Sequence, residues 1–355
     1  MPPECSGRPG VARASLCSGR RPGYTPAMNK RERVTAALKG EPVDRVPLAF
    51  WMHNFATENS AKDLAGETLR LAREFGWDYL KPQSRAQCFA ETWGLRYRAS
   101  GQRAVPYTVT EKPCAGAADL ARLQPVDPRG GSLGEQLEAL RLIRAGLGPD
   151  TPIIWTVFSP MMVVPFLLRG GREQAFAIMR SEPAALEHAL ETIAETLAGY
   201  AQACLEAGAD GLFYATNVAT RELMTAAECR RFQRPYDLSI LNAAAPAPFN
   251  VLHVCGTGVL FAEFTDYPVH AVSWATVPEN PTLREGRRRT GRAVMGGLPA
   301  KPAIATMSAA SIADRCRSAV AETQGRWLLL GPDCSINPDT PDALMRAARA
   351  AVHGR

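Results

Sequence analysis

The sequence predicts an α/β protein in which eight parallel strands and their helices close into a (β/α)8 barrel, the TIM-barrel architecture, in a single domain. Eight short apolar runs follow residue 28, and helical patterns separate them. Most of these runs are continuous rather than alternating, which is typical of parallel strands buried on both faces. Eight strands that each precede a helical segment favour a closed barrel. A hydrophobic fraction of 46% in 355 residues is enough for a core of that size.

The strands are expected in apolar runs that end in turn residues. In chain order they are RVPLAFWM (45–52), DYLKPQ (78–83), PIIWTVF (152–158), DGLFYAT (210–216), NVLHVCG (250–256), AVSWA (271–275), AVMGGLP (293–299) and WLLLGPDC (327–334). The span between the second and third runs is longer than one helix requires. We therefore expect an insertion there, around residues 84–131.

The clearest predicted helix lies in residues 181–210, where apolar side chains recur every three or four positions. Ser181 is expected to cap its start, and Pro183 suits the first turn. Gly208 is expected to end it.

Three further segments have helical patterns. Residues 225–244 contain Pro235, which predicts a kink or two separate helices, because proline cannot continue the backbone ladder. Residues 306–323 and 340–353 complete the set.

The first 27 residues differ in composition from the rest of the chain. They are rich in Gly, Pro, Arg and Ser, and they contain four arginines against one acidic residue. Such a segment buries too little apolar surface to fold alone, and it has no apolar stretch of signal-peptide length. We expect residues 1–27 to be a disordered or spurious extension, and residues 28–355 to form the barrel.

Charge and cysteine usage exclude several classes of function. The formal net charge is +6, from 41 basic and 35 acidic residues, with no dense basic stripe interleaved with aromatics. Nucleic acid is therefore not an expected partner. No window approaches the roughly 18 apolar residues of a membrane span, so no membrane association is expected. Nine scattered cysteines without a signal sequence indicate reduced thiols in a cytoplasmic protein.

Three metal-ligating side chains fall at predicted strand ends. His253 and Cys255 close the fifth strand, and Cys334 closes the eighth. Residues two apart on a strand point to the same face, and a barrel brings strand ends around one mouth. A His, Cys, Cys set suits tetrahedral zinc with a fourth position left for substrate. Taken singly, each cysteine also fits a small buried hydrophobe, and the histidine fits a hydrogen-bonded core group.

Other polar residues at strand ends are candidates for substrate binding, although each also fits an ordinary loop position. They are His53 and Asn54 after the first strand, Lys81 and Gln83 at the second, Ser159 at the third, and Tyr214 and Asn217 at the fourth. Asp333, beside Cys334, is expected either to orient a ligand or to cap the following turn.

Four stretches of the sequence resemble the uroporphyrinogen decarboxylase superfamily. They are MNKRERVTAALKGEPVDRVPLAFW, DYLKPQ followed by AETWG, LHVCG, and NPDTPDALMRA, and the resemblance covers nearly all of residues 28–355. The superfamily contains decarboxylases and zinc-dependent methylcobamide:coenzyme M methyltransferases, both on (β/α)8 barrels. The methyltransferases use a His-x-Cys pair and a distant Cys as zinc ligands, and His253, Cys255 and Cys334 match that pattern.

The chain departs from the decarboxylase branch at the positions that hold substrate. Where decarboxylases have two arginines in a motif like MRQAGRY, this chain has WMHNFATENS. Their Gly-His-Gly is replaced by GPDC, and their tyrosine after PWT is absent from WTVFSPMM. The resemblance therefore implies a methyltransferase. A decarboxylase of porphyrin biosynthesis and a non-catalytic zinc-binding barrel, with its site closed by four protein ligands, remain the alternatives.

The methyltransferase resemblance also implies cofactors and partners. Zn²⁺ would activate a small-molecule thiol, which attacks a methyl group carried on the corrinoid of a separate protein. Two cysteine thiolates would offset the zinc charge and keep the substrate sulfur nucleophilic. Glu279 is the nearest carboxylate after the sixth strand and is a candidate fourth ligand, the other reading being an exposed loop carboxylate. The methyl donor, the thiol and the oligomeric state stay open, a homodimer among the options.

Overall fold

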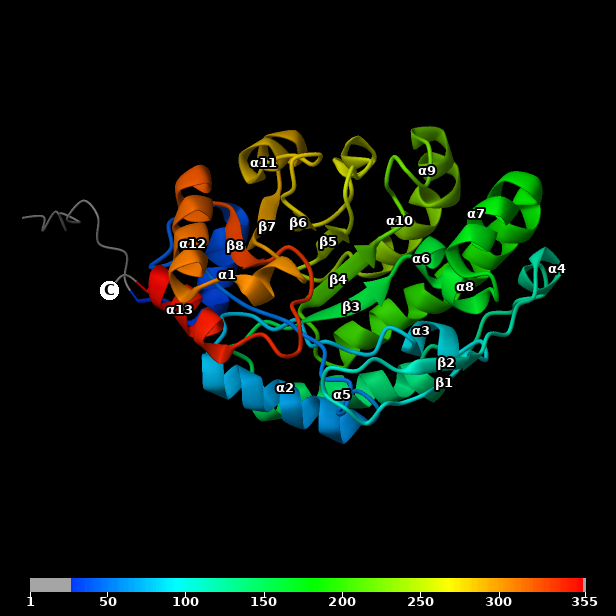
Figure 1. The fold of residues 1–355 in the computed structure, drawn as a ribbon, viewed down its shortest axis with the longest axis horizontal. Coiled ribbons are helices and arrows are strands. Elements are labelled where there is room, and N and C mark those ends of the chain that lie inside the picture. The colour runs from blue at the N-terminus through cyan, green and yellow to red at the C-terminus, as the bar shows by residue number, and fades with distance from the viewer. Residues whose placement is uncertain (1–26, 354–355) are drawn as a thin grey trace, which may run out of the picture.

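Six strands of the computed structural model, which describes residues 27–353, form one parallel sheet in chain order. They are β3 (Ile154–Phe158), β4 (Gly211–Thr216), β5 (Val251–Val254), β6 (Ala271–Trp274), β7 (Ala293–Leu298) and β8 (Leu328–Pro332). All six are buried along their whole length, as the continuous apolar runs predict. Helices surround this sheet (Figure 1). The expected extension, residues 1–27, lies outside the described residues except for Ala27.

The first two predicted strands close the sheet into a barrel as irregular extended segments. Leu48 and Met52 form parallel bridges to Leu330 and Ile336, and Leu80 bridges to Ile153. The N–H of Asp78 donates to Leu48 O over 3.0 Å, which joins the two segments. Pro47 and Pro82 lack the N–H that a regular ladder needs, so the pairing stays short. The barrel prediction is confirmed.

The helices cover the barrel between successive strands. They are α1 (Lys30–Lys39), α2 (Ala61–Phe75), α5 (Gly131–Leu147), α6 (Pro160–Leu167), α7 (Gly171–Ser181), α8 (Pro183–Glu206), α9 (Ala226–Phe232), α10 (Arg234–Ala243), α11 (Leu283–Thr290), α12 (Ala309–Thr323) and α13 (Asp342–Val352). Two short 3-10 turns, η1 (Phe261–Phe264) and η2 (Ala303–Thr306), follow β5 and β7. No helix within residues 27–353 has the length and apolar composition that crossing a bilayer requires.

Three of the helix predictions are confirmed and one is wrong. Pro235 separates α9 from α10, and Pro183 occupies the first turn of α8. Ser181 does not cap α8, because it is the last residue of α7 and its hydroxyl donates to Ala177 O over 3.0 Å. Gly208 follows the end of α8 with φ +108°, a conformation that suits glycine.

The predicted insertion between the second and third strands is present. It contains α3 (Cys88–Glu91), an antiparallel pair of β1 (Arg96–Arg98) and β2 (Thr108–Glu111), and α4 (Ala117–Leu120). These elements lie at one end of the molecule, with α3, β1 and β2 beside α5 (Figure 1). The buried Arg85 fixes the insertion by pairing with Glu91 at 2.7 Å and with Glu135 of α5 at 2.9 Å.

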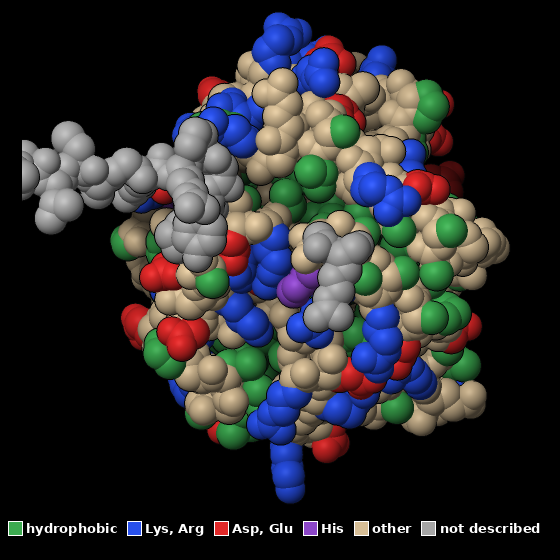
Figure 2. Space-filling model, turned by 90° about the vertical axis from the view of Figure 1, so that its left-hand side faces the viewer, with side chains coloured by type: hydrophobic (Ala, Val, Ile, Leu, Met, Phe, Trp, Pro, Cys, Tyr) green, Lys and Arg blue, Asp and Glu red, His purple; other side chains and the backbone are tan. Residues whose placement is uncertain are grey.

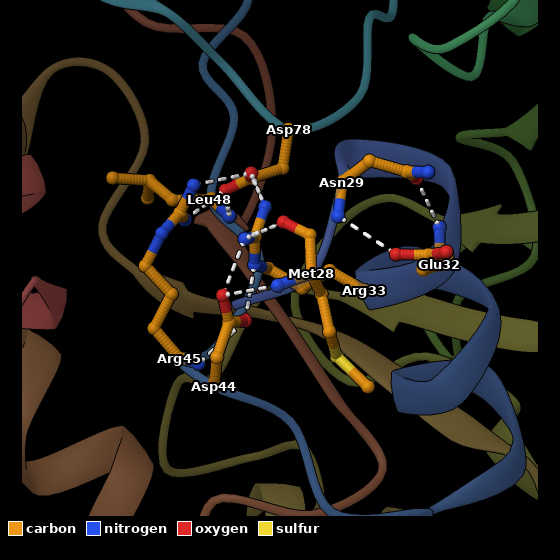
Figure 3. A network of polar contacts seen from close by, with 8 residues as sticks. All are labelled: Met28, Asn29, Glu32, Arg33, Asp44, Arg45, Leu48 and Asp78. Atoms are coloured by element: carbon orange, nitrogen blue, oxygen red, sulfur yellow. Dashed lines mark hydrogen bonds and ion pairs between the residues drawn. The ribbon is translucent and has the colours of Figure 1, made fainter. Parts of the chain in front are cut away.

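A buried ionic network joins α1 to the starts of the first two strands (Figure 3). Asp78 is 1% exposed and accepts from Arg33 over 2.8 Å, from Arg45, and from the N–H of Leu48 over 2.9 Å. Asp44 accepts two further bonds from Arg33, each of 2.6 Å. Elsewhere, over α12 and α13, basic and acidic side chains are interspersed (Figure 2).

Candidate metal centre

The structure brings His253, Cys255 and Cys334 together at the carboxyl ends of the strands. One ligand atom of each lies within 4.8 Å of the others. His253 belongs to β5 and Cys255 follows it, so the two side chains share the inner face of the barrel. Cys334 follows β8 and reaches the same point from across the barrel. Barrel closure thus unites residues that are 79 positions apart in the sequence.

His253 presents one ring nitrogen to the cluster. Its Nδ1 lies 3.1 Å from Ser273 Oγ, on the neighbouring strand at the matching register position. Its Nε2 is buried and has no hydrogen-bond partner among the described residues. With the proton on Nδ1, Nε2 keeps a free lone pair, the form in which imidazole binds a metal. A buried acceptor without a partner is costly, so a metal ligand role accounts for its position.

The two cysteine sulfurs lie 3.7 Å apart. Two sulfurs that each bind a tetrahedral zinc at about 2.3 Å are themselves about 3.8 Å apart, so this spacing fits zinc. The Cys255 thiol donates to the Cys334 sulfur, and this bond, together with the neighbouring His253, lowers the pKa of Cys334; the same bond, with burial, raises the pKa of Cys255. The pair therefore loses one proton readily and the second with difficulty. A bound cation would favour loss of both.

The backbone around both cysteines is held firmly. The N–H of Cys255 donates to Thr216 O over 2.8 Å, and Gly256 turns the chain with φ +125°. The buried Asp333 accepts from the N–H and hydroxyl of Thr276 over 2.8 and 2.7 Å and from the N–H of Gly297 over 3.1 Å. Asp333 thus ties the Cys334 turn to the loop after β6 and to β7 itself.

An aromatic layer covers one side of His253. Phe213 of β4 stacks on the His253 ring with centroids 5.1 Å apart, and Trp51 packs edge-on against Phe213 at 5.6 Å. Both side chains are buried. Phe213 and Ser273 were not expected at the site. The alternation of side chains along a strand could have predicted both, since each lies on the inner face of a strand that pairs with β5.

A polar chain on the first two strands approaches the site. Lys81 Nζ donates to Gln83 Oε1 over 2.5 Å, and Gln83 Nε2 lies 2.9 Å from His53 Nε2. His53 Nδ1 lies 2.7 Å from Glu58 Oε1. The structure thus joins three predicted candidates and adds the buried Glu58, which had no sequence signal. Lys81 also lies over the Phe213 ring, 4.9 Å from its centroid.

Asn54 lies beside this polar chain but faces α2. Its Nδ2 donates to Glu67 Oε1 over 3.1 Å, and its backbone N–H donates to Glu58 over 2.9 Å. Asn54, Glu58, Lys81 and Gln83 border a cavity of about 30 Å³, which has room for about one water molecule.

Four other predicted site residues fall outside the cluster. Tyr214 points away from the mouth toward the helices, because it neighbours the inward-facing Phe213, and its hydroxyl donates to Asp237 of α10 over 2.6 Å. Ser159 caps α6 by accepting from the N–H of Met162. Asn217 follows β4 and is half-buried. Glu279 is exposed and is not part of the His253, Cys255, Cys334 group, which agrees with the other expectation, an exposed loop carboxylate.

The chain is similar to proteins of a known family. The family model described as "Uroporphyrinogen decarboxylase (URO-D)" matches residues 29–355. The methylcobamide:CoM methyltransferase MtaA of Methanosarcina barkeri is 26% identical over 348 residues, which cover 90% of this chain and 96% of the relative. A uroporphyrinogen decarboxylase of Vibrio campbellii is 30% identical over 207 residues, which cover 52% of this chain and 56% of that enzyme.

Solved structures share the fold. A methyltransferase from Methanosarcina mazei superposes with a TM-score of 0.74 at 24% identity, over 91% of this chain and 98% of that chain. A B12-independent methionine synthase from Shewanella sp. W3-18-1 superposes with a TM-score of 0.51 at 15% identity, over 87% of this chain and 94% of that chain. At these identities the likeness shows the barrel fold alone.

Proposed function

The chain belongs to the uroporphyrinogen decarboxylase family, and from that premise we propose that it is a zinc-dependent methyltransferase that activates a thiol for methylation. The observation that carries the proposal is the cluster of His253, Cys255 and Cys334 at the carboxyl ends of the strands. The relatives named as methylcobamide:CoM methyltransferases support it, because the match to MtaA spans nearly the whole of both chains.

The three ligand side chains fit one chemical role. Zinc held by them would supply Lewis acidity, which lets a thiol in the fourth position lose its proton and become a nucleophile. Ser273 orients His253 through Nδ1, and Asp333 holds the turn of Cys334. Phe213 and Trp51 exclude water from one side of His253. These residues pre-organise the ligands before substrate arrives.

The decarboxylase alternative agrees less well with the polar groups at the mouth. The region after the first strand holds the acidic Glu58, buried at 2% exposure and bonded to His53. Glu58 cannot pair with a substrate carboxylate, and the nearby Lys81 supplies one positive charge for a substrate that has many carboxylates. The partial match to decarboxylases keeps this reaction as a second candidate, and it is included in the test.

The proposed methyl donor is a corrinoid protein, with coenzyme M as the first thiol to test. Methyl transfer forms a carbon–sulfur bond and breaks the carbon–cobalt bond, whose electron pair stays on cobalt. Free methylcobalamin can replace the partner protein in the first assay. The expected products are the methyl thioether, identified by mass spectrometry, and cob(I)alamin, followed by its absorbance.

Three results decide between the candidates. Elemental analysis is expected to find about one zinc per chain in protein purified without chelators. Cobalt(II) in place of zinc is expected to change its absorption spectrum when a thiol is added, because the fourth position is open. A protein with no stoichiometric metal contradicts the proposal, and conversion of uroporphyrinogen to coproporphyrinogen would replace it. A metal that never responds to thiols favours the non-catalytic zinc barrel.

A further inference from the structure

Lys81 is a buried cation beside Phe213, the ring that stacks on the candidate metal ligand His253. Its side chain is only 6% exposed, and it forms no ion pair with any residue between 27 and 353. Its Nζ lies over Phe213, and the same ring stacks on His253. The lysine and the proposed metal ligand therefore share one aromatic wall. A buried charge without a carboxylate partner is expensive, which points to a function at this position.

The hydrogen bonds around Lys81 fix its orientation. Lysine only donates when charged, so Gln83 must turn Oε1 toward Nζ and Nε2 toward His53. His53 then accepts at Nε2 and donates from Nδ1 to Glu58. Each group in the chain has a single consistent orientation. Gln83 accepts from one position on Nζ, and among residues 27–353 no second hydrogen-bond acceptor of Nζ is present.

The surroundings of Lys81 bring its pKa close to neutral pH, so its amine can both bind and lose a proton. Burial lowers the pKa of Lys81 to about 7, while the negative charges of Cys334 and Glu58 partly oppose this shift. Gln83 lies between Lys81 and His53, and the Phe213 ring contacts both Lys81 and His253. The neutral amine is therefore accessible at physiological pH, and a new negative charge in the mouth would favour the ammonium form.

We propose that Lys81 Nζ accepts the proton that a thiol substrate loses when it binds beside His253, Cys255 and Cys334. This inference rests on the proposed function. The S–H bond of the thiol breaks, an N–H bond forms at Nζ, and the electron pair of the S–H bond stays on sulfur. No oxidant or further reactant is needed. The ammonium group then forms together with a nearby sulfur anion, so neither charge is buried alone.

The test counts protons released when a thiol binds. Isothermal titration of the zinc-loaded full chain with coenzyme M, in buffers of different ionisation enthalpy, gives that count. For the native protein we expect release of nearly one proton at about pH 6, where Lys81 is already charged. We expect release of close to none at about pH 8, where the neutral amine takes the proton up.

Two substitutions at Lys81 separate proton transfer from charge. Lys81→Met keeps a long apolar stem and cannot accept a proton, so it should release nearly one proton at both pH values and bind coenzyme M at least about tenfold more weakly. Lys81→Arg stays charged at both values, so it should also release one proton but keep more of the affinity. Lys112→Met is the matched control. The Lys112 ammonium donates to Pro165 O and Leu168 O, and its loss should leave the native proton count.

The outcomes distinguish this inference from the proposed function. Thiol binding with one proton released by the native protein at both pH values overturns the role of Lys81 and leaves the methyltransferase proposal intact. If Lys81→Met releases the same number of protons as the native protein at both pH values, the role of Lys81 is likewise overturned and the methyltransferase proposal stands. If the zinc-loaded chain binds neither coenzyme M nor 2-mercaptoethanol, both proposals fail together.

Discussion

His253 shows how a single side chain is prepared for its chemistry by its neighbours. Ser273 holds Nδ1, Phe213 stacks on the ring, and Nε2 is left toward the two cysteines. Ser273 and Phe213 come from β6 and β4, the two strands that pair with β5. A partner of this kind sets the tautomer of a ligand histidine and thereby influences metal affinity.

Replacing Ser273 with alanine should weaken zinc binding without removing it. The variant loses the acceptor for Nδ1–H, so the imidazole is free to take the other tautomer or to rotate. We expect zinc affinity to fall about 10- to 100-fold, measured by competition with a chelator. Ser159→Ala is a suitable control, since that hydroxyl caps α6 away from the metal cluster. Equal affinities in Ser273→Ala and the native protein would contradict the role assigned to Ser273.

Cys334→Ser should remove most zinc affinity and leave the barrel folded. A serine hydroxyl is a poor zinc ligand at neutral pH, because its proton is hard to displace. Asp333 and the buried β8 strand would still hold the turn. Elemental analysis and circular dichroism measure the two effects.

Cys316→Ser is the matched control for that substitution. Cys316 is fully buried on α12 and does not belong to the metal cluster, so its loss should change stability but not zinc content. If Cys334→Ser retained full zinc while Cys316→Ser lost it, the proposed ligand set would be wrong.

At the scale of elements, the barrel depends on how its two irregular strands are attached. Each makes only a few backbone bonds, and the ionic network around Asp78 holds their starts against α1 (Figure 3). Polar groups at the amino ends of barrel strands usually serve stability, whereas those at the carboxyl ends form the site. The network of Arg33, Asp44, Arg45 and Asp78 is at the amino end.

Asp78→Asn should therefore destabilise the fold but leave the metal site intact. The change removes the charge that compensates Arg33 and Arg45, and breaking a buried pair in this way costs about 3–5 kcal/mol. Urea denaturation measures the free energy of unfolding. Asp266→Asn, which breaks an ion pair whose aspartate side chain is 68% exposed, should cost less than about 1 kcal/mol. Similar losses in both variants would contradict the importance of the buried network.

At the scale of the whole molecule, residues 28–32 fix the first helix of the barrel through a helix cap and a backbone hydrogen bond. Asn29 and Glu32 form a full capping box for α1, and the N–H of Met28 donates to Asp44 over 3.0 Å. All the site residues and the family match lie beyond this point. We therefore predict that residues 1–27 are dispensable for the barrel and the site.

A chain that begins at Met28 should keep its fold and zinc content. Its terminal ammonium would stand where the Met28 N–H now meets Asp44, so that contact would gain charge. We expect the thermal midpoint to stay within about 2 °C of the full chain, measured by calorimetry, since a loss below about 1 kcal/mol shifts it little. Truncation at Glu32 is the control and should destabilise, because it removes the cap and the Met28 contact. A large loss from deleting residues 1–27 would refute the expectation that they are dispensable.

The sequence by itself determined the barrel and the three metal-ligand candidates. Continuous apolar runs reveal buried parallel strands, and the spacing of His253 and Cys255 places both on one face. The split at Pro235 and the insertion after the second strand also follow from local rules, because a missing N–H or an overlong connection acts where it occurs.

Only the tertiary structure decided which polar residues share the site. Tyr214 and Phe213 are adjacent on β4 and so point to opposite faces, and the pairing of β4 with β5 decides that the phenylalanine meets His253 while the tyrosine meets Asp237. Glu279 was placed near the metal by its position after the sixth strand, but its loop holds it at the surface. Ser273 gained its role from His253 on the neighbouring strand, and Glu58 is linked to Lys81 through His53 and Gln83. Local propensity acts over a few residues, whereas these contacts depend on barrel closure and register, which join segments far apart in the chain.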